Sequence, residues 1–496
     1  MTRVLEKKTR HSTRWRRVLG SETRHRPSEW SVRMVAGSDS GGLVGLRLSI
    51  ALAKSGIHVS FVSTPRNIQR LPKLPPSLAT LMKFVEFPLP TLDNNDILPE
   101  GAEASVDVPA DKLEYLKLAY DRLQYPINQF VAEQLPDWII ADFSAHWAVE
   151  IAQNYNVGFI YFAVFSAATV VLFGKPPNYF FVGDQKQAWP SPESLTSPPE
   201  WLSFPSSVAF RGYEAVWAHA GAYTEDASGI SDAARFTKVL RACKALAIRS
   251  CREFEGEFLS LQEKLMGKPV IPIGLLPPKR HEETEGNDSS WKTIFEWLDK
   301  QEPKSVLFVG FGSECQLSKE QLYEIAYGLQ LSQVPFLWAL RKPFWAIDDE
   351  DSLPSGFIDT TSGKGMVCMG WAPQKEILAH PSVGGSLFHS GWGSAIEMLQ
   401  FGHCLVVLPF IFDQPLNARL LVDKGVAVEV ERGEDGSFSR DGIAKAVEMA
   451  MVLEEGDKLR TRAREAAAIF GDENLHQVNY IGHFVKYLKH GGSNEI

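Results

Sequence analysis

Patterns typical of buried strands alternate with patterns typical of amphipathic helices along this chain, in two separate series. The first series begins with a short apolar strand at Val32–Ala36, a glycine-containing loop at Gly37–Gly42 and a helix at Leu43–Lys54. The second begins with a strand at Ser305–Gly310, after the polar stretch Lys279–Ser290. Parallel strands need a crossover connection, usually a helix, so this alternation predicts a parallel sheet in each half. We expect two α/β domains with a ligand cleft between them, at the carboxyl ends of the strands.

The other expected elements continue both series and add a C-terminal tail. The tail, Asn474–Lys489, is a separate amphipathic helix, and in a two-domain protein such a helix can cross back to brace the first domain. The remaining first-half elements are strands at His58–Ser63, Trp138–Ala141 and Gly158–Val164 and a helix at Ala145–Gln153. In the second half we expect helices at Lys319–Leu331, Gln374–Leu378, Ser394–Phe401 and Gln414–Asp423, and strands at Pro335–Leu340, Gly365–Met369, Gly384–Phe388 and Cys404–Val407.

Charge is unevenly distributed along the 496 residues. Residues 1–30 hold nine Lys and Arg against three Glu, a balance of +6 in a chain whose formal net charge is −9. The rest of the chain is therefore acidic, which argues against a nucleic-acid partner bound through a basic stripe. The basic leader lacks the apolar run of a secretory signal, and its Glu residues disfavour a transit peptide. We interpret it as a disordered extension, with a targeting segment and a binding arm as alternatives.

Composition and cysteine spacing narrow the class of protein further. The chain is 44% hydrophobic and 22% charged, which suits large buried cores and excludes a disordered or collagen-like chain. Its five cysteines include no CxxC pair, so we expect free thiols in the cytoplasm rather than a zinc site or a disulfide framework. The uncharged stretch Asn154–Gly174 resembles a membrane span. Gly158, Ser166 and Thr169 interrupt it, so a buried strand followed by a helix fits better.

Two side chains in the second half are suited to a nucleoside. Trp371, two residues ahead of a proline, offers a flat face for stacking on a base, although a core tryptophan is the alternative. Glu397, one turn into the helix expected from Ser394, can accept two hydrogen bonds from a ribose diol. The alternative for Glu397 is a solvated first-turn glutamate that complements the helix dipole.

The segment His389–Ser394, HSGWGS, joins a buried strand to that helix. Its glycines let the backbone approach a ligand, and Ser394 and the helix N-terminus present N–H donors to an anion. His389 adds a donor or a charge beside a phosphate. Asp413 and Gln414 end another strand-to-helix loop, with acceptors and amide donors that suit sugar hydroxyls. Together these side chains describe a pocket for base, ribose, diphosphate and hexose.

The whole stretch from Trp371 to Gln414 resembles, nearly position for position, the signature box of plant UDP-dependent glycosyltransferases of secondary metabolism. The resemblance extends from about Leu48 to the C-terminus and implies the GT-B fold, two Rossmann-like domains facing across a cleft. Further matching segments are Phe61–Asn67, Leu98–Ser105, Val270–Pro278 and Val309–Glu314. The first two of these are most similar to the subgroup that adds a sugar to an existing sugar, such as the rhamnosyl- and glucosyltransferases acting on flavonoid or terpenoid glycosides.

The resemblance implies that the two domains bind different substrates. It implies an acceptor-binding domain over residues 31–260, a UDP-sugar-binding domain over 261–465, and a C-terminal helix over 466–496 that packs back on the first domain. The expected partners are a UDP-sugar and a small-molecule glycoside. We expect the chain to be a monomer and to need no metal and no other cofactor.

The resemblance also implies a role for each donor-binding residue. Trp371 would stack on uracil with Gln374 along the base, and Glu397 would hold the ribose hydroxyls. Ser313, His389 and Ser394 would bind the diphosphate, with Trp392 and Gly393 beside them, while Asp413 and Gln414 would hold the donor sugar. Gly393 stands where many members have Asn, so one side-chain contact to phosphate is missing and backbone N–H donation would have to cover it.

An inverting sugar transfer needs a base for the acceptor hydroxyl, and a histidine with a carboxylate behind it suits this. In the family that His lies in a loop of the form FGHxxPxxxL leading into the first helix. Here Gly41 occupies its position, and Ser38–Gly45 lacks the aromatic residue and the proline. Asp142 matches the orienting carboxylate. Its alternative role is that of an N-cap for the helix starting near Ser144.

Three interpretations of the missing histidine stay open. A coding sequence with a wrong first exon would explain the foreign leader and the altered loop together, and we favour it. Alternatively, the chain is a catalytically impaired UDP-sugar-binding protein, or Asp39, Asp142 or His146 replaces the base. The glycines of Gly37–Gly45 also hint at a dinucleotide-binding loop of an oxidoreductase, but their spacing is not GxGxxG and no acid follows the second strand.

Overall fold

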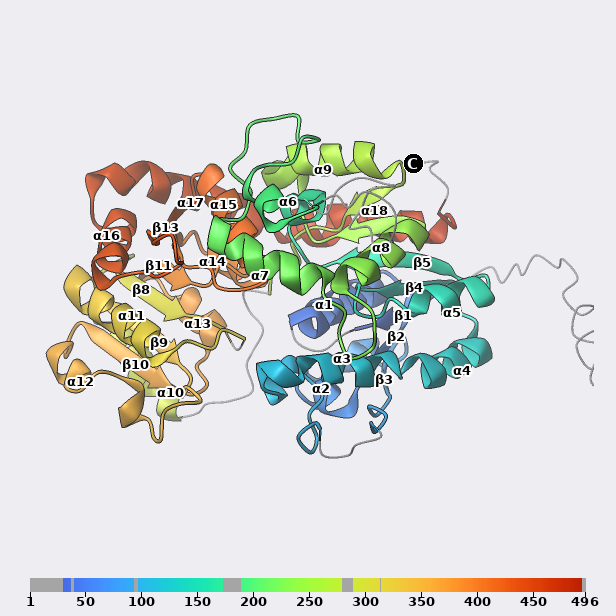
Figure 1. Ribbon diagram of the computed structural model, residues 1–496, viewed down its shortest axis with the longest axis horizontal. Helices are drawn as coiled ribbons and strands as arrows, with labels where there is room; N and C mark the ends of the chain where they lie inside the picture. Colours follow the sequence, from blue (N-terminus) through green and yellow to red (C-terminus); the bar gives the residue numbers. More distant parts are fainter. Residues whose placement is uncertain are drawn as a thin grey trace, which may run out of the picture.

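Two α/β lobes lie side by side in the computed structural model of this protein, which describes residues 30–36, 40–92, 97–172, 189–278, 289–312 and 314–492 (Figure 1). One lobe holds strands β1 to β7 and the other holds β8 to β13. Neighbouring strands are parallel throughout both sheets. The expected α/β class with two parallel sheets is confirmed.

The first sheet has the strand order β3-β2-β1-β4-β5-β6-β7. Its central strand β1 lies between β2 and β4, and the side chains from Val32 to Ala36 are buried. The strand order reverses between β1 and β4, and open α/β sheets bind ligands outside such a reversal. The strands are β1 Ser31–Val35, β2 His58–Ser63, β3 Met82–Glu86, β4 Trp138–Ala141, β5 Gly158–Ala163, β6 Ala245–Ile248 and β7 Val270–Pro272.

The second sheet has the strand order β10-β9-β8-β11-β12-β13 and reverses between β8 and β11. The register pairs Gly310 with Phe388, so the loops that begin at Phe311 and His389 leave the sheet side by side. The strands are β8 Val306–Gly310, β9 Phe336–Leu340, β10 Gly365–Met369, β11 Val383–Phe388, β12 Cys404–Val407 and β13 Ala427–Glu429.

Helices connect the strands in both lobes. Those of the first lobe are α1 Ser40–Lys54, α2 Pro65–Gln69, α3 Leu113–Asp121, α4 Gln124–Gln134, α5 Ala148–Asn154, α6 Ala167–Leu172, α7 Gly212–Tyr223, α8 Asp232–Ala242 and α9 Arg252–Met266. Those that follow are α10 Ser289–Leu298, α11 Lys319–Ser332, α12 Phe357–Thr360, α13 Gln374–Leu378, α14 Trp392–Leu399, α15 Gln414–Asp423, α16 Arg440–Met451, α17 Asp457–Phe470 and α18 Ile481–Lys489.

Three boundaries differ from the sequence-based expectation. Helix α1 begins at Ser40, so Ser40–Gly42 is helical rather than loop, because a first turn tolerates Ser and Gly when the following apolar residues pack into the core. Helix α5 begins at Ala148 instead of Ala145, because the Asp142 carboxylate accepts backbone hydrogen bonds and holds a turn there. Strand β7 pairs with β6, so the first sheet continues beyond the boundary expected after residue 260, which falls inside α9.

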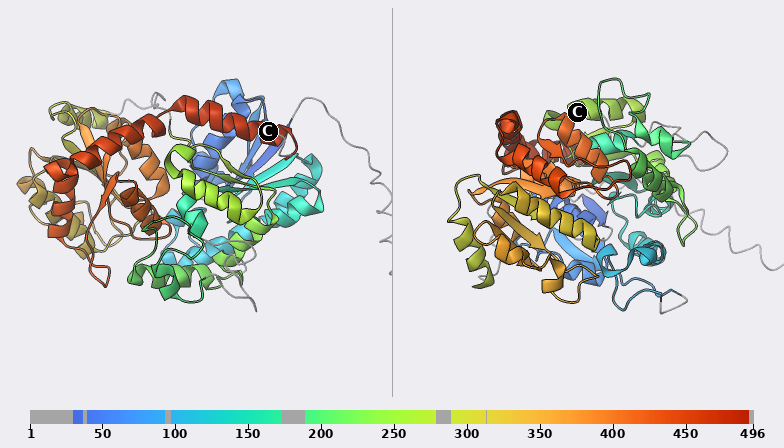
Figure 2. Two further views of the ribbon diagram at one scale, coloured as in Figure 1. Left: turned by 90° about the horizontal axis from the view of Figure 1, so that it is seen from above. Right: turned by 60° about the vertical axis from the view of Figure 1, so that its left-hand side comes forward.

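The C-terminal tail crosses from the second lobe to the first. In the left view of Figure 2, the red helix runs from one lobe along the top of the other, where the chain ends. Its first part, Asn474–Tyr480, is a π-helix that leads into α18. Ile481, Phe484 and Leu488 are buried in the same core cluster as residues of β1 and α1, and Trp138 Nε1 donates to the Leu488 carbonyl at 3.1 Å. The expected bracing of the first domain is confirmed.

Polar side chains tie the two lobes together at their interface. Arg419 of α15 donates from Nη2 to both carboxylate oxygens of Glu214 in α7, at 2.9 and 2.8 Å, and both side chains are buried. The Ser166 hydroxyl, ahead of α6, donates to Asn417 Oδ1 at 2.8 Å. These bonds hold the loops and helices of the first lobe against the helix that follows β12.

The uncharged stretch from Asn154 forms strand β5 and helix α6 as far as it is described. Across the described ranges, no helix has the length and apolar character needed to cross a membrane.

Candidate active site

Two adjoining cavities lie between the lobes. The larger, of about 1340 Å³, is lined by Arg47 of α1 and by Trp371, Gln374 and Glu397 of the second lobe. The smaller, of about 400 Å³, brings together the donor-binding residues expected around a diphosphate and a sugar. Its lining includes Gly42, Arg249, His389, Gly393, Ser394, Asp413 and Gln414. Leu43 and Gly312 line both cavities, which therefore meet at the start of α1.

The larger cavity has the chemistry of a nucleoside site. Trp371 is 68% exposed and lies at 5.1 Å, ring centroid to centroid, from Trp291 of α10, so it is not the core tryptophan of the alternative interpretation. Glu397 accepts from Gln374 Nε2 at 3.1 Å and from Arg47 Nη2 at 3.2 Å, one partner on each carboxylate oxygen. Glu397 is therefore held in the cleft rather than solvated at the surface of α14. A flat aromatic face and a fixed carboxylate suit a base and a ribose diol.

The smaller cavity is lined by the start of α14 and by His389, which is half-buried. Two glycines make room for its ring: a Cβ on Gly312, whose φ is +71°, would lie 2.9 Å from His389 Cε1, and one on Gly391 would lie 2.6 Å from Nε2. Burial lowers the pKa of His389 to about 4, so its imidazole is neutral near pH 7. His389 can thus contribute a hydrogen bond to an anion, but not the positive charge that the sequence left open.

Asp413 and Gln414 also line the smaller cavity, and both side chains make hydrogen bonds within their own loop. Burial raises the pKa of Asp413 to about 6, and Asn417 Nδ2 donates to its carboxylate at 2.8 Å. Gln414 Oε1 accepts from the backbone N–H groups of Phe410 and Ile411, at 3.0 Å each. The amide carbonyl of Gln414 therefore shapes the loop. Its NH₂ group donates to Cys315 Sγ at 3.8 Å, and its second N–H is the one suited to a sugar hydroxyl.

Two other residues expected to bind the UDP-sugar, Trp392 and Ser313, are not seen to offer a polar group to the cavities. Trp392 is buried, packs near Phe254 and donates from Nε1 to the Arg249 carbonyl at 2.9 Å, so its indole joins the lobes rather than presenting a polar group to a ligand. Ser313 lies outside the described residues.

The position of the expected base is occupied by the first turn of α1. Gly41 is helical, and the next residue, Gly42, lines the smaller cavity beside Ser394. Asp142 Oδ1 accepts from the backbone N–H groups of Ser144 and Ala145, at 2.9 and 3.4 Å, and so holds the turn ahead of α5 rather than capping that helix, whose N-cap residue is Trp147. Asp142 lies outside the lining of both cavities.

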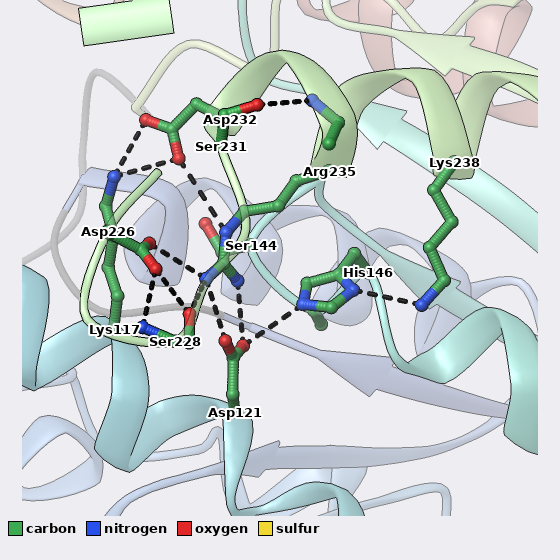
Figure 3. A network of polar contacts seen from close by, with 12 residues as sticks. Lys117, Asp121, Ser144, His146, Asp226, Ser228, Ser231, Asp232, Arg235 and Lys238 are labelled. Atoms are coloured by element: carbon green, nitrogen blue, oxygen red, sulfur yellow. Dashed lines mark hydrogen bonds and ion pairs between the residues drawn. The ribbon is translucent and has the colours of Figure 1, made fainter. Parts of the chain in front are cut away.

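His146 belongs to a separate polar network, drawn in Figure 3. Its Nε2 lies 3.3 Å from Asp121 Oδ1 and its Nδ1 lies 3.1 Å from Lys238 Nζ. Arg235 holds the same Asp121 with two hydrogen bonds of 2.8 and 2.7 Å. Burial alone would raise the pKa of Asp121, but the contacts with His146 and Arg235 hold it below its ordinary value. His146, like Asp142, lines neither cavity, and Asp39 lies outside the described residues.

Three residues near the cavities escaped the sequence analysis. Arg47 and Arg249 come from the first half of the chain, where no motif marks a donor contact, and Trp291 directly follows the polar junction. A lone Arg in an amphipathic helix or after a buried strand carries no recognisable signal. All five cysteines are free thiols.

Comparisons with known proteins agree with this geometry. The family model described as "UDP-glucoronosyl and UDP-glucosyl transferase" matches residues 287–465. UDP-glycosyltransferase 91C1 of Arabidopsis thaliana is 41% identical over 451 residues, which cover 90% of this chain and 94% of that relative. Soyasaponin III rhamnosyltransferase of Glycine max is 40% identical over 442 residues, or 88% of this chain and 90% of that relative.

Solved structures share the fold. Arabidopsis thaliana UGT89C1 complexed with UDP-L-rhamnose matches with a TM-score of 0.67 and 24% identity, over 92% of this chain and 98% of that one. Glycyrrhiza uralensis UGT73P12 matches with a TM-score of 0.71 and 21% identity, over 94% and 96%. The two Rossmann-like lobes are therefore a GT-B fold. With relatives of this identity over nine tenths of its length, the chain belongs to the plant UDP-dependent glycosyltransferases of secondary metabolism.

Proposed function

We propose that this glycosyltransferase moves rhamnose or glucose from a UDP-sugar to a hydroxyl of a small plant glycoside, such as a flavonoid or terpenoid glycoside. The observation that carries the proposal is the pair of adjoining cavities between the lobes. The larger offers Trp371 and Glu397 to a nucleoside, and the smaller offers Ser394 and Asp413 to a diphosphate-linked sugar.

A glycoside acceptor is supported by two segments of the first lobe. Phe61–Asn67 and Leu98–Ser105 resemble the sugar-on-sugar subgroup and pack against each other: Asn67 Nδ2 donates to the Glu103 carbonyl at 2.9 Å. Asn67 and Ala104 line the smaller cavity together with the donor-binding residues. The Asn67 amide also donates to the Thr64 hydroxyl at 2.9 Å, so its remaining capacity for an acceptor hydroxyl is that of Oδ1, which accepts from Arg70 at 3.3 Å. The similarity to a rhamnosyltransferase of Glycine max adds support for a deoxyhexose donor.

The transfer itself is a displacement at the anomeric carbon. The acceptor oxygen attacks, the bond between the sugar and the diphosphate breaks, and UDP leaves with the electron pair. The acceptor proton must pass to a base, and Gly41 supplies none. Loss of a general base typically costs about 10²–10⁴ in rate. We therefore expect donor binding to be intact and transfer to be slow, and Gly41→His alone to fall short of full activity because the loop around it also differs.

We also propose that the reaction takes place in the cytoplasm and that the protein acts as a monomer. Hydrogen-bond donors of the protein, rather than a metal ion, would hold the diphosphate. The five free thiols support a reducing compartment. Over the described part of the chain, no group of three or more His, Cys, Asp or Glu side chains is arranged to hold a metal ion.

The test is a transfer assay with purified full-length protein. UDP-glucose and UDP-rhamnose are each incubated with a flavonoid glycoside and without it, and products are followed by chromatography and mass spectrometry, which distinguishes a hexose from a deoxyhexose. Glu397→Ala serves as the variant with an impaired nucleoside site. Acceptor-dependent product from the natural chain supports the proposal.

Other outcomes decide against it. UDP binding without transfer to any glycoside would indicate a sugar-nucleotide-binding protein. Binding of a nicotinamide dinucleotide in place of UDP would indicate an oxidoreductase and overturn both assignments.

A further inference from the structure

A buried arginine of the first lobe reaches the smaller cavity. Arg249 directly follows β6, and its side chain is only 1% exposed. Its Nε donates to the Leu275 carbonyl at 2.7 Å, while its Nη2 has no hydrogen-bond partner among the described residues. A buried guanidinium with an unused donor is costly, because the lost hydration is not replaced. A ligand that offers a hydrogen-bond acceptor to Nη2 would remove this cost.

The guanidinium is directed at the start of α14. A Cβ built on Gly393 would meet Arg249 Nη1 at 3.4 Å, and among the described residues no other atom outside α14 lies within 4 Å of it. Arg249 and Ser394 line the same cavity. The Trp392 indole donates to the Arg249 carbonyl, which fixes the arginine backbone against α14. The helix N-terminus and the guanidinium, whose Nη2 lacks a partner, thus converge on one space.

Positive groups gather at the end of this space where α14 begins. Arg47 and Arg249 lie near one carboxylate, Glu397, which is already paired with Arg47. The rest of the cavity lining is mixed in charge and includes Arg70, Glu314 and Asp413. Burial and the nearby Arg47 lower the pKa of Arg249 to about 9, against the opposing effect of Glu397, so the guanidinium stays charged at pH 7. His389 is neutral, and α14 adds the positive end of its dipole. A phosphate group satisfies this arrangement, because guanidinium matches its oxygens with two donors at once.

We propose that Arg249 binds the diphosphate of the UDP-sugar and takes the place of the side-chain amide that Gly393 lacks. The inference rests on the proposed function, since it deepens the donor site defined there. An asparagine side chain at residue 393 would grow into the space that the guanidinium occupies, so the two side chains are alternatives for the same contact. Donor binding then depends on both lobes, because one ligand of the diphosphate comes from the first.

The test measures binding of UDP, uridine and inorganic pyrophosphate by titration calorimetry. Arg249→Met removes the charge while keeping a side chain of similar reach, and Arg249→Lys keeps the charge. Arg33→Met is the matched control, because Arg33 is another buried arginine of the first sheet, away from both cavities. We expect Arg249→Met to weaken UDP and pyrophosphate about 10- to 100-fold and uridine less than about threefold. Arg249→Lys should weaken UDP less than Arg249→Met does.

The space shared by residues 249 and 393 allows a second measurement. Gly393→Asn in the natural background should weaken UDP binding, because the new side chain crowds the guanidinium. In the Arg249→Met background the same substitution should restore part of the lost affinity. These variants keep the inference testable if Arg249→Met alone folds poorly, as judged by circular dichroism and thermal unfolding beside Arg33→Met.

The outcomes separate this inference from the proposed function. UDP binding that Arg249→Met leaves unchanged, or an equal loss for UDP and uridine, would overturn the inference and leave the donor assignment in place. Arg249-dependent binding of pyrophosphate without any uridine binding would support the inference and overturn the uridine donor. A Gly393→Asn variant that binds UDP more tightly than the natural chain would also overturn the inference.

Discussion

Replacement of Glu397 by glutamine tests the nucleoside end of the site most directly. The carboxylate is 22% exposed, and each of its oxygens already accepts one hydrogen bond, from Arg47 or from Gln374. A ribose hydroxyl that donates to this carboxylate makes a hydrogen bond to a charged group, worth about 1.5–3 kcal/mol. Partial exposure and the existing partners bring the expected value to the lower end of that range, so we expect about a tenfold effect.

Comparing the UDP affinity of the natural protein with that of Glu397→Gln would combine two effects of opposite sign. Glu397→Gln removes the acceptor for the ribose, but it also releases Arg47 from its ion pair and makes the neighbouring anion site more positive. The ligand can be changed in parallel to isolate the ribose contact. Natural protein and Glu397→Gln are each titrated with UDP and with 2′-deoxy-UDP, at one pH and ionic strength, as a double-mutant cycle.

The expected result is a coupling of about 1.4 kcal/mol, which means that the natural protein discriminates against the deoxy ligand about tenfold more than the variant does. Glu434→Gln, an exposed carboxylate remote from both cavities, controls for the change in net charge. Equal discrimination by natural protein and Glu397→Gln would refute the assignment of Glu397 to the ribose.

Three further predictions address stacking on the uracil base, the ion pair between the lobes, and the dependence of stability on pH. Trp371→Ala should weaken uridine binding by about 1–3 kcal/mol through lost stacking, and an unchanged affinity by calorimetry would contradict this. Arg419→Met leaves Glu214 buried without its cation, so it should lower the free energy of unfolding in urea by about 3–5 kcal/mol, more than Arg419→Met with Glu214→Leu does; a larger loss in the double variant would contradict the argument. Burial lowers the pKa of His403 to about 3, so the unfolded chain binds this proton from about pH 6.5 downward while the folded chain excludes it. The free energy of unfolding should therefore fall by about 2 kcal/mol between pH 7 and pH 5 on account of His403, and His403→Gln should show a shallower dependence; equal slopes would show that another group is responsible.

The sequence was informative wherever the periodicity of apolar residues determines an element. The alternation of strands and helices predicted both parallel sheets, and the pattern at Asn474–Lys489 predicted the crossing tail. The site residues between Trp371 and Gln414 gather around two adjoining cavities because they follow the carboxyl ends of β10, β11 and β12, which belong to one parallel sheet. Such clustering can be read from a sequence once the strand order is assumed.

Contacts between the lobes could not be predicted in this way. Strand β6 was not among the expected strands, and no pattern in the sequence gives the direction of Arg249, whose position depends on how two separately folded sheets dock. The same holds for Arg47, which faces Glu397 only across the cleft. Gln414 shows a further limit: its residue type suggests a sugar contact, yet local backbone geometry engages its carbonyl oxygen with Phe410 and Ile411.

The crossing tail has a consequence for how this chain is made. Ile481, Phe484 and Leu488 belong to the same core cluster as Val32 and Leu48, so the first lobe is built from both ends of the chain. During synthesis the ribosome releases the first sheet early, but the apolar face covered by α18 stays open until the last residues emerge. The second lobe is complete before the first. A nascent chain arrested in the tail would therefore hold a finished nucleotide-binding lobe beside an unfinished partner.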